Sequence, residues 1–202
     1  MLTMAQLLAP LARRRTDEVV VTTMSAVRPW GRLSSHDLDF GSGDSAMGHA
    51  ADLALGIALA QPRRRVICVN GDGSMAMSLG TLLTIVEAGA PNLALIVVEN
   101  GTYEITGHQT VPGARSADLA DMARAAGFRA AWPVEDAASW EARVEDVLSA
   151  PGPLFVGARV EPGREGPIRR SPSEEARYLK VSLAEWSRTM REALLSAPRS
   201  GE

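Results

Sequence analysis

Cysteine is nearly absent from this chain, because Cys68 is the only one among its 202 residues. A single thiol excludes an internal disulfide, a CxxC redox pair and a cysteine-rich zinc or iron–sulfur site. Long apolar runs are also missing, since no stretch approaches the roughly 20 residues of a membrane helix. The first arginines follow the early apolar residues rather than precede them, which is unlike an export signal. We therefore expect a soluble, cytoplasmic protein that has no membrane partner.

An excess of positive charge is absent as well. Lys and Arg number 21 against 24 Asp and Glu, so the net charge of -3 offers no basic field for nucleic acid. Two arginine clusters, at residues 13–15 and 63–65, are expected to be solvated ends of secondary-structure elements. Neither GxxxxGKS nor GxxxxGKT occurs, which excludes a P-loop nucleotide enzyme.

Short valine-rich runs alternate with helical patterns along the chain. The runs, which are typical of strands buried on both faces, lie at residues 18–22, 65–70, 93–98, 129–132 and 154–160. Helical patterns lie at residues 1–17, 47–62, 75–90, 117–126, 137–150 and 183–195, and a glycine-containing loop is expected at residues 23–46. This alternation predicts an α/β fold with a parallel sheet flanked by helices. It divides the chain into an N-terminal helix (1–17), a central domain (18–162), and a C-terminal arm and helix (163–202).

Two polar motifs follow neighbouring strands of the predicted sheet: GDGS at residues 71–74 and ENGTY at residues 99–103. Ligands of such sheets bind beyond the carboxyl ends of the strands, so we expect Asp72 and Asn100 to face one crevice. Carboxylate and amide oxygens suit Mg²⁺, which usually takes one or two carboxylates and completes its shell with water and phosphate. The glycines let the backbone approach phosphate, and Ser74 offers a hydroxyl at a helix N-terminus. Each motif alone also fits an ordinary turn, and only the pair favours a metal site.

These motifs resemble the cofactor motif of thiamine diphosphate enzymes, in which GDG is followed by NN. Here Glu99 stands at the position of the first Asn and Asn100 at the second. DSAMGHAADLALGIAL, TGHQT and VEPGREGPIRRSPSEE also resemble segments of phosphonopyruvate and sulfopyruvate decarboxylases, so that the similarity covers most of residues 18–180. The resemblance implies a thiamine diphosphate-binding fold for the central domain, with thiamine diphosphate and Mg²⁺ as cofactors. The implied metal ligands are Asp72, Asn100 and the backbone carbonyl of Thr102.

Matching positions imply further contacts to the cofactor. Met47 would be the apolar wedge beneath it, although a plain core methionine is the alternative, and Ser45 would offer its backbone carbonyl to the 4′-amino group. The full set of implied cofactor-binding residues is Thr23, Ser25, Ser45, Met47, Gly48, Gly71, Gly73, Ser74 and Tyr103. Glu104 and His108 follow the metal site directly and are candidate catalytic acid/base groups, although a surface histidine often has no such role.

One part that the family needs is missing from this chain. The glutamate that activates the cofactor comes from a separate pyrimidine-binding domain, which the sequence does not match. The resemblance therefore implies a β subunit whose α subunit supplies this glutamate, in an α2β2 assembly with two sites related by a two-fold axis. The apolar helices at residues 51–60 and 75–90 are candidates for the interface, and simple core packing explains them equally well.

The implied reaction is the decarboxylation of a short 2-oxoacid, such as one with a sulfonate or phosphonate tail. Two alternatives stay open. A carboligase of the acyloin or acetohydroxyacid synthase type would join the activated acyl group to a second carbonyl compound, and product analysis would separate it from a decarboxylase. A noncatalytic regulatory protein on the same fold is the other alternative, which a loss of activity in Asp72→Ala would argue against.

Overall fold

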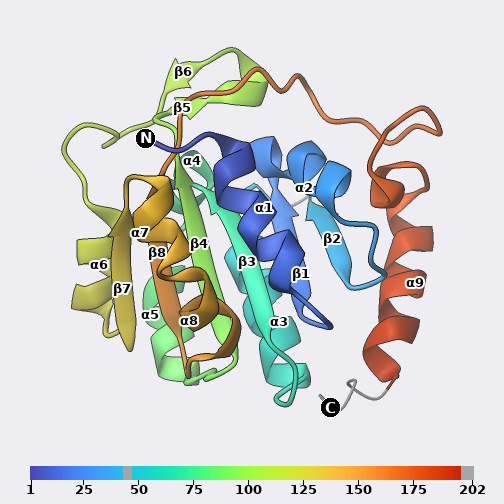
Figure 1. The fold of residues 1–202 in the computed structure, drawn as a ribbon, viewed down its shortest axis with the longest axis horizontal. Coiled ribbons are helices and arrows are strands. Elements are labelled where there is room, and N and C mark those ends of the chain that lie inside the picture. The colour runs from blue at the N-terminus through green and yellow to red at the C-terminus, as the bar shows by residue number, and fades with distance from the viewer. Residues whose placement is uncertain (43–46, 197–202) are drawn as a thin grey trace.

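The computed structural model of this protein describes residues 1–42 and 47–196. Within these residues, six strands form one sheet in the order β2-β1-β3-β4-β8-β7 (Figure 1). Every pair of neighbours in it is parallel. The strands are β1 (Val19–Thr23), β2 (Asp39–Ser42), β3 (Val66–Gly71), β4 (Leu93–Glu99), β7 (Ala130–Val134) and β8 (Leu154–Arg159). The predicted fold class, a parallel sheet flanked by helices, is confirmed.

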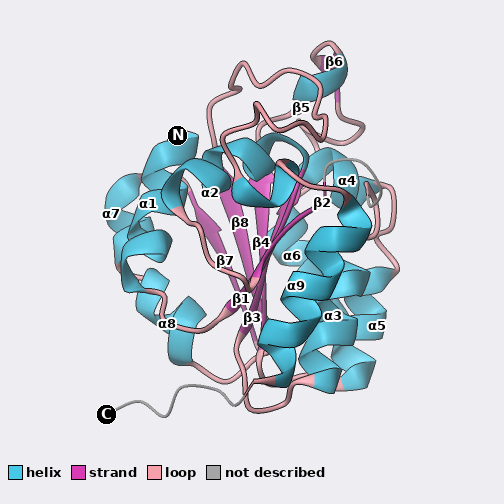
Figure 2. Ribbon diagram, turned by 90° about the vertical axis from the view of Figure 1, so that its right-hand side faces the viewer, coloured by secondary structure: helices cyan, strands magenta, loops and turns pink. Residues whose placement is uncertain are grey.

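Helices cover both faces of the sheet (Figure 2). One face carries α1 (Met4–Arg14), α2 (Val27–Leu33), α7 (Ala137–Glu141) and α8 (Val144–Ser149). The other face carries α3 (Ala50–Ala60), α4 (Asp72–Ala76), α5 (Thr81–Ala88) and α6 (Leu119–Ala126). The last helix, α9 (Leu183–Leu195), lies beside the edge strand β2, where the Trp186 indole N–H donates to the Asp39 carbonyl at 2.7 Å. None of the helices described here has the length and apolar character needed to cross a membrane.

A small antiparallel hairpin stands above the carboxyl ends of the strands (Figure 1). Its strands are β5 (Thr102–Tyr103) and β6 (Gln109–Thr110). Short 3-10 turns are η1 (Met24–Ala26), η2 (Glu104–Thr106) and η3 (Arg177–Leu179). The hairpin and η1 both follow sheet strands at the edge where ligands of parallel sheets bind.

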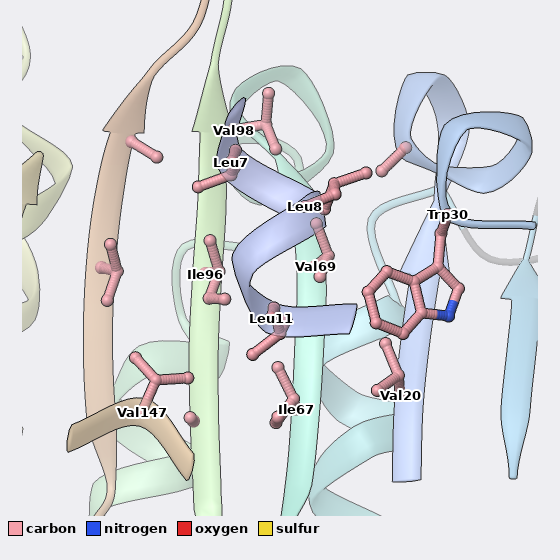
Figure 3. Packing of buried hydrophobic residues seen from close by; sticks show 14 of the residues in the cluster. Leu7, Leu8, Leu11, Val20, Trp30, Ile67, Val69, Ile96, Val98 and Val147 are labelled. Carbon is pink, nitrogen blue, oxygen red and sulfur yellow. The ribbon is translucent and has the colours of Figure 1, made fainter. Parts of the chain in front are cut away.

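The core lies on both faces of the sheet because its inner strands are apolar along their whole length. All five residues of β1 are buried, as are the first six of β4. Figure 3 shows Leu7, Leu8 and Leu11 of α1 packed over Val69 of β3 and Ile96 of β4. A helix that places three fully buried leucines on two central strands is an integral part of the core.

Three stretches differ from the sequence-based expectation. Residues 23–46 contain α2 and the edge strand β2 in place of a plain loop. The helix expected at 75–90 begins at Asp72 and is divided into α4 and α5, and the one expected at 137–150 is divided into α7 and α8. The sequence of β2, DFGS, is too short and too polar to show a strand period, and VRPWGRL of α2 contains both Pro and Gly, which disfavour helix.

The expectation of solvated arginines is wrong for two members of the clusters. The side chains of Arg15 and Arg64 are only 5% and 2% exposed. Arg15 forms an ion pair with the fully buried Asp39, which also accepts hydrogen bonds from the Trp30 indole at 2.9 Å and the Ser34 hydroxyl at 2.5 Å. A charged side chain can be buried when its charge is paired. These arginines therefore join secondary-structure elements through buried polar contacts.

Replacing Asp39 is expected to destabilise the fold strongly. Asp39→Ala leaves the buried Arg15 guanidinium without its carboxylate, a change that typically costs about 3–5 kcal/mol. Urea denaturation followed by circular dichroism measures the free energy of unfolding. The matched control is Asp146→Ala, which removes an exposed ion pair with Arg143 and should cost less than about 1 kcal/mol. Equal losses in the two variants would contradict the structural importance of the buried pair.

Candidate functional site

The carboxyl ends of β3 and β4 bring together the two motifs that the sequence analysis singled out. These strands pair in register, with Gly71 opposite Val98, so Asp72 and Asn100 follow at the same edge of the sheet. One Asp72 carboxylate oxygen accepts the Gly101 N–H at 2.7 Å, and the other accepts the Gly73 N–H at 2.7 Å. The predicted crevice therefore exists, and Asp72 ties the start of α4 to the turn after β4.

A small cavity of about 30 Å³ opens at this edge. Its lining residues are Met24, Ser25, Met47, Gly71, Asp72, Gly73, Ser74, Asn100, Thr102, Tyr103, Glu104, Ile105 and Thr106. This volume accommodates one or two waters or an ion, because a water needs about 10–15 Å³ of such space. A ligand as large as a dinucleotide or a cofactor would extend beyond the cavity.

Most of the residues expected at the site line this cavity, and a few do not. Thr23 is buried at the end of β1, where its hydroxyl donates to the Ser42 carbonyl at 2.8 Å. Gly48 lies behind the wall, and its N–H donates to the Ser74 hydroxyl at 2.9 Å. Ser45 lies outside the described residues.

Three lining residues were not among the predicted cofactor, metal or catalytic residues: Met24, Ile105 and Thr106. Met24 adopts a left-handed backbone conformation with φ of 51°, which turns the chain sharply after β1. A non-glycine residue at positive φ is uncommon and often marks a functional turn. The sequence offered one signal, since Met24 stands where the resembling decarboxylases have a small residue.

The surroundings of Asp72 stabilise the charged form of its carboxylate only in part. It is 7% exposed. Burial raises the pKa of Asp72, while the backbone N–H groups of Gly101 and Gly73 act in the opposite direction. A cation beside the carboxylate would favour its charged form and relieve the cost of burial.

The donor set at this edge fits a magnesium ion that also binds a phosphate ligand. Asn100 is 9% exposed, and its Oδ1 accepts the Thr102 N–H at 3.1 Å. The Thr102 hydroxyl is buried and has no hydrogen-bond partner within the described chain. No three His, Cys, Asp or Glu side chains that could hold a metal ion gather in residues 1–42 and 47–196. One carboxylate and one amide oxygen suit Mg²⁺ when phosphate and water complete the shell.

The two glycines that flank Asp72 have different surroundings. A Cβ atom on residue 73 would lie 2.4 Å from a carbon of the Tyr103 ring, whereas a Cβ on residue 71 would meet no atom within 4 Å. Gly73 therefore lets the hairpin tyrosine pack directly on the start of α4. Gly71 leaves open space in the wall of the cavity.

The two candidate acid/base residues occupy different environments. Glu104 is 6% exposed, and its carboxylate accepts hydrogen bonds from the Asn100 side-chain amide at 2.9 Å and from the backbone N–H groups of Gly163 at 3.0 Å and Glu165 at 2.9 Å. His108 is exposed at the tip of the hairpin, with φ of 60°, and is not among the cavity-lining residues. The structure thus brings Glu104 to the metal-site residues and leaves His108 outside the cavity.

A larger cavity of about 450 Å³ shares Asp72 and Asn100 as lining residues with the small one. Its wall includes Glu99, Arg115 and Arg159. Burial, and after it the negative charges of Asp118 and Asp72, raise the pKa of Glu99 to about 7. In the sequence, Glu99 stands out only as a departure from the family motif, and nothing there indicates this cavity, because part of its wall comes from residues 111–117.

The family described as thiamine pyrophosphate enzyme, C-terminal TPP binding domain, matches residues 22–158. This chain belongs to that family. The match includes the Asp72 and Asn100 segments and every strand from β2 to β8. The resemblance to thiamine diphosphate enzymes is therefore confirmed.

Curated relatives include decarboxylases of small 2-oxoacids. A phosphonopyruvate decarboxylase of Streptomyces viridochromogenes is 34% identical over 179 residues, which cover 87% of this chain and 44% of that protein. The sulfopyruvate decarboxylase subunit beta of Methanothermobacter thermautotrophicus is 34% identical over 138 residues, which cover 67% of this chain and 71% of the relative. This chain thus spans less than half of the phosphonopyruvate decarboxylase and most of the subunit.

Solved structures agree on the fold. Benzoylformate decarboxylase of Polynucleobacter necessarius matches with a TM-score of 0.62 and 20% identity, covering 79% of this chain and 33% of that one. At this identity, the likeness concerns the fold alone.

Gly73→Ala is expected to lower the free energy of unfolding by about 1–3 kcal/mol, because the added methyl group collides with the Tyr103 ring. Gly71→Ala is the matched control and should change it by less than about 0.5 kcal/mol, because its methyl group enters open space. Urea titrations of both variants measure the difference. If the two variants were equally stable, the close packing of Tyr103 on α4 would be wrong.

Proposed function

We propose that this chain is the β subunit of a heteromeric decarboxylase that uses thiamine diphosphate and Mg²⁺, with residues 18–162 as its diphosphate-binding domain. The proposed substrate is a short 2-oxoacid of the sulfopyruvate or phosphonopyruvate kind. The observation that carries the proposal is that Asp72, Asn100 and Thr102 line one cavity at the edge of the sheet, with the Asp72 side chain buried there. The names of the curated relatives support the substrate class.

In the proposed enzyme, the metal ligands are the Asp72 carboxylate, the Asn100 amide oxygen and the Thr102 carbonyl. The diphosphate would lie against Gly71, Gly73 and Ser74, which line the cavity, and Gly71 leaves open space there for a ligand. Met47 lines the same cavity and would support the ring system from below. When bound, thiamine diphosphate supplies the electron sink for the carbanion that loss of CO2 leaves behind.

The partner in this proposal is an α subunit with a pyrimidine-binding domain, which supplies the activating glutamate in an α2β2 assembly. Two observations support a partner. The beta subunit from Methanothermobacter matches over most of its length, and its name implies a second subunit. In addition, the stretch that follows Asp72 carries exposed apolar side chains, Met77, Leu79 and Leu83, which are 59%, 38% and 63% exposed. An exposed apolar patch beside the proposed site suits an interface with another chain.

His108 remains the proposed donor of the proton that replaces CO2. Its hairpin follows the metal site, and the neighbouring Ile105 and Thr106 line the cavity. A partner subunit that covers the cavity would bring the exposed hairpin next to the substrate. His108→Gln should then lower kcat while leaving metal-dependent cofactor binding unchanged.

The proposal is tested by calorimetric titration of thiamine diphosphate and Mg²⁺ into the chain, alone and mixed with its α-subunit candidate. Asp72→Ala is expected to abolish the Mg²⁺-dependent heat, because it removes the only carboxylate in the proposed ligand set. Asp121→Ala, which removes an exposed carboxylate of α6, should bind like the wild type.

Screening of short 2-oxoacids with the binding mixture then distinguishes the products. An aldehyde supports decarboxylation, and an acyloin or acetohydroxyacid supports carboligation instead. If neither the chain nor the mixture binds the cofactor, the catalytic proposal fails and a noncatalytic role takes its place.

A further inference from the structure

A C-terminal arm, defined as residues 161–176, crosses the carboxyl edge of the sheet between β8 and α9. In Figure 1 it runs from the top of β8, past the β5–β6 hairpin, toward α9 at the far side of the molecule. Most of the arm has no regular secondary structure and is exposed. Its position therefore depends on side-chain contacts with the elements it crosses.

Glu104 makes the contacts at the β8 end of the arm. Its carboxylate accepts the backbone N–H groups of Gly163 and Glu165 at 3.0 and 2.9 Å, and the same side chain accepts the Asn100 amide at 2.9 Å. Hydrogen bonds to a charged acceptor are stronger than neutral ones. One buried carboxylate thus joins the arm to the amide that faces the proposed metal site.

The bond to Glu104 fixes which end of the Asn100 amide faces the cavity. A carboxamide has an NH2 group that donates and an oxygen that accepts. Because Glu104 takes the NH2 group, the amide oxygen points to the side of Thr102, where its second lone pair stays available to a cation. Without the carboxylate, the amide can rotate and present its NH2 group instead.

Helix α2 holds the rest of the arm through two arginines, Arg28 and Arg32. Arg28 donates to the carbonyls of Gly166 at 2.9 Å and Pro167 at 3.0 Å, and it forms a two-pronged ion pair with Glu174. Arg32 pairs with Glu165 at 2.7 Å. This helix begins directly after η1, whose Met24 and Ser25 line the cavity. The arm therefore bridges two walls of one site.

The close approach of the arm to Glu104 requires a glycine. A Cβ atom on residue 163 would lie 2.8 Å from a Glu104 carboxylate oxygen. The carboxylate cannot move aside without loss, because three N–H groups hold it. A substitution of Gly163 therefore tests the contact between the arm and Glu104 without changing Glu104 itself.

We propose that Glu104 is a positioning residue that orients Asn100 for the metal and couples docking of the arm to cofactor binding. This inference rests on the proposed function and replaces the acid/base role that the sequence suggested for Glu104. Such coupling is reciprocal: an arm that stabilises the metal site is itself stabilised when Mg²⁺ and thiamine diphosphate bind. Residues that orient metal ligands typically contribute about 10–100-fold to metal affinity. We expect an effect of the same order for Glu104.

Two readouts on the full complex test the coupling. The first is the Mg²⁺ dissociation constant at saturating thiamine diphosphate. Glu104→Ala should raise it about 10–100-fold. Glu104→Gln should raise it less, because the glutamine oxygen can still accept from Asn100 while its NH2 group faces the Glu165 N–H. Glu161→Ala, which removes an exposed carboxylate of the same arm, is the matched control and should bind as the wild type does.

The second readout is hydrogen exchange of the peptide that covers residues 161–167. In the wild type, Mg²⁺ and thiamine diphosphate should slow its exchange. In Glu104→Ala the peptide should exchange fast whether or not the ligands are present, and Gly163→Ala should give the same loss of protection with Glu104 intact. If Glu104→Ala does not fold, Glu104→Gln and Gly163→Ala carry the test.

The outcomes separate this inference from the proposed function. If the wild-type complex binds the cofactor and Glu104→Ala binds Mg²⁺ within twofold of it, the inference is overturned and the proposed function stands. The inference is also overturned if Mg²⁺ and thiamine diphosphate do not slow the hydrogen exchange of residues 161–167 in the wild type. If the wild-type complex does not bind the cofactor at all, both fail together.

Discussion

A buried carboxylate at the end of a central strand is the constraint on which this site depends. Asp72 stands where β3 becomes α4, and its two oxygens accept N–H groups from its own helix and from the turn after β4. It therefore fixes the relative positions of two strand ends. The same burial raises the pKa of Asp72 and disfavours its charge, so the fold holds a carboxylate that a cation would stabilise. In the proposed enzyme, this one carboxylate serves both the fold and the metal site.

Beyond Asp72, hydrogen bonds link parts of the site that lie far apart in the sequence. Asn100 comes next along the sheet edge, Glu104 orients its amide, and the arm beyond β8 reaches Glu104 through two backbone N–H groups. Helix α2 then returns the arm to the cavity wall through Arg28. A chain of polar contacts thus runs from Asn100 through Glu104 and the arm to helix α2, whose preceding turn lines the same cavity.

The sequence predicted those parts of the protein whose signals are local. Valine-rich runs revealed the inner strands, and residues at their carboxyl ends had to meet because parallel strands share that edge. It could not predict that Glu104 binds the backbone near Gly163, or that Arg15 is buried against Asp39, because such contacts join distant residues and leave no periodicity. Edge strand β2 was missed for a related reason, since four residues containing Gly and Ser carry too little pattern.

The central claim is that Asp72, Asn100 and Thr102 hold one metal ion. Crystals of the complex grown with thiamine diphosphate and Mn²⁺ in place of Mg²⁺ test it directly, because Mn²⁺ scatters anomalously. The account predicts one anomalous peak at bonding distance, about 2.0–2.3 Å, from the Asp72 carboxylate, the Asn100 amide oxygen and the Thr102 carbonyl. A peak elsewhere, such as beside Glu99 in the larger cavity, or none in crystals that contain the cofactor, would contradict it.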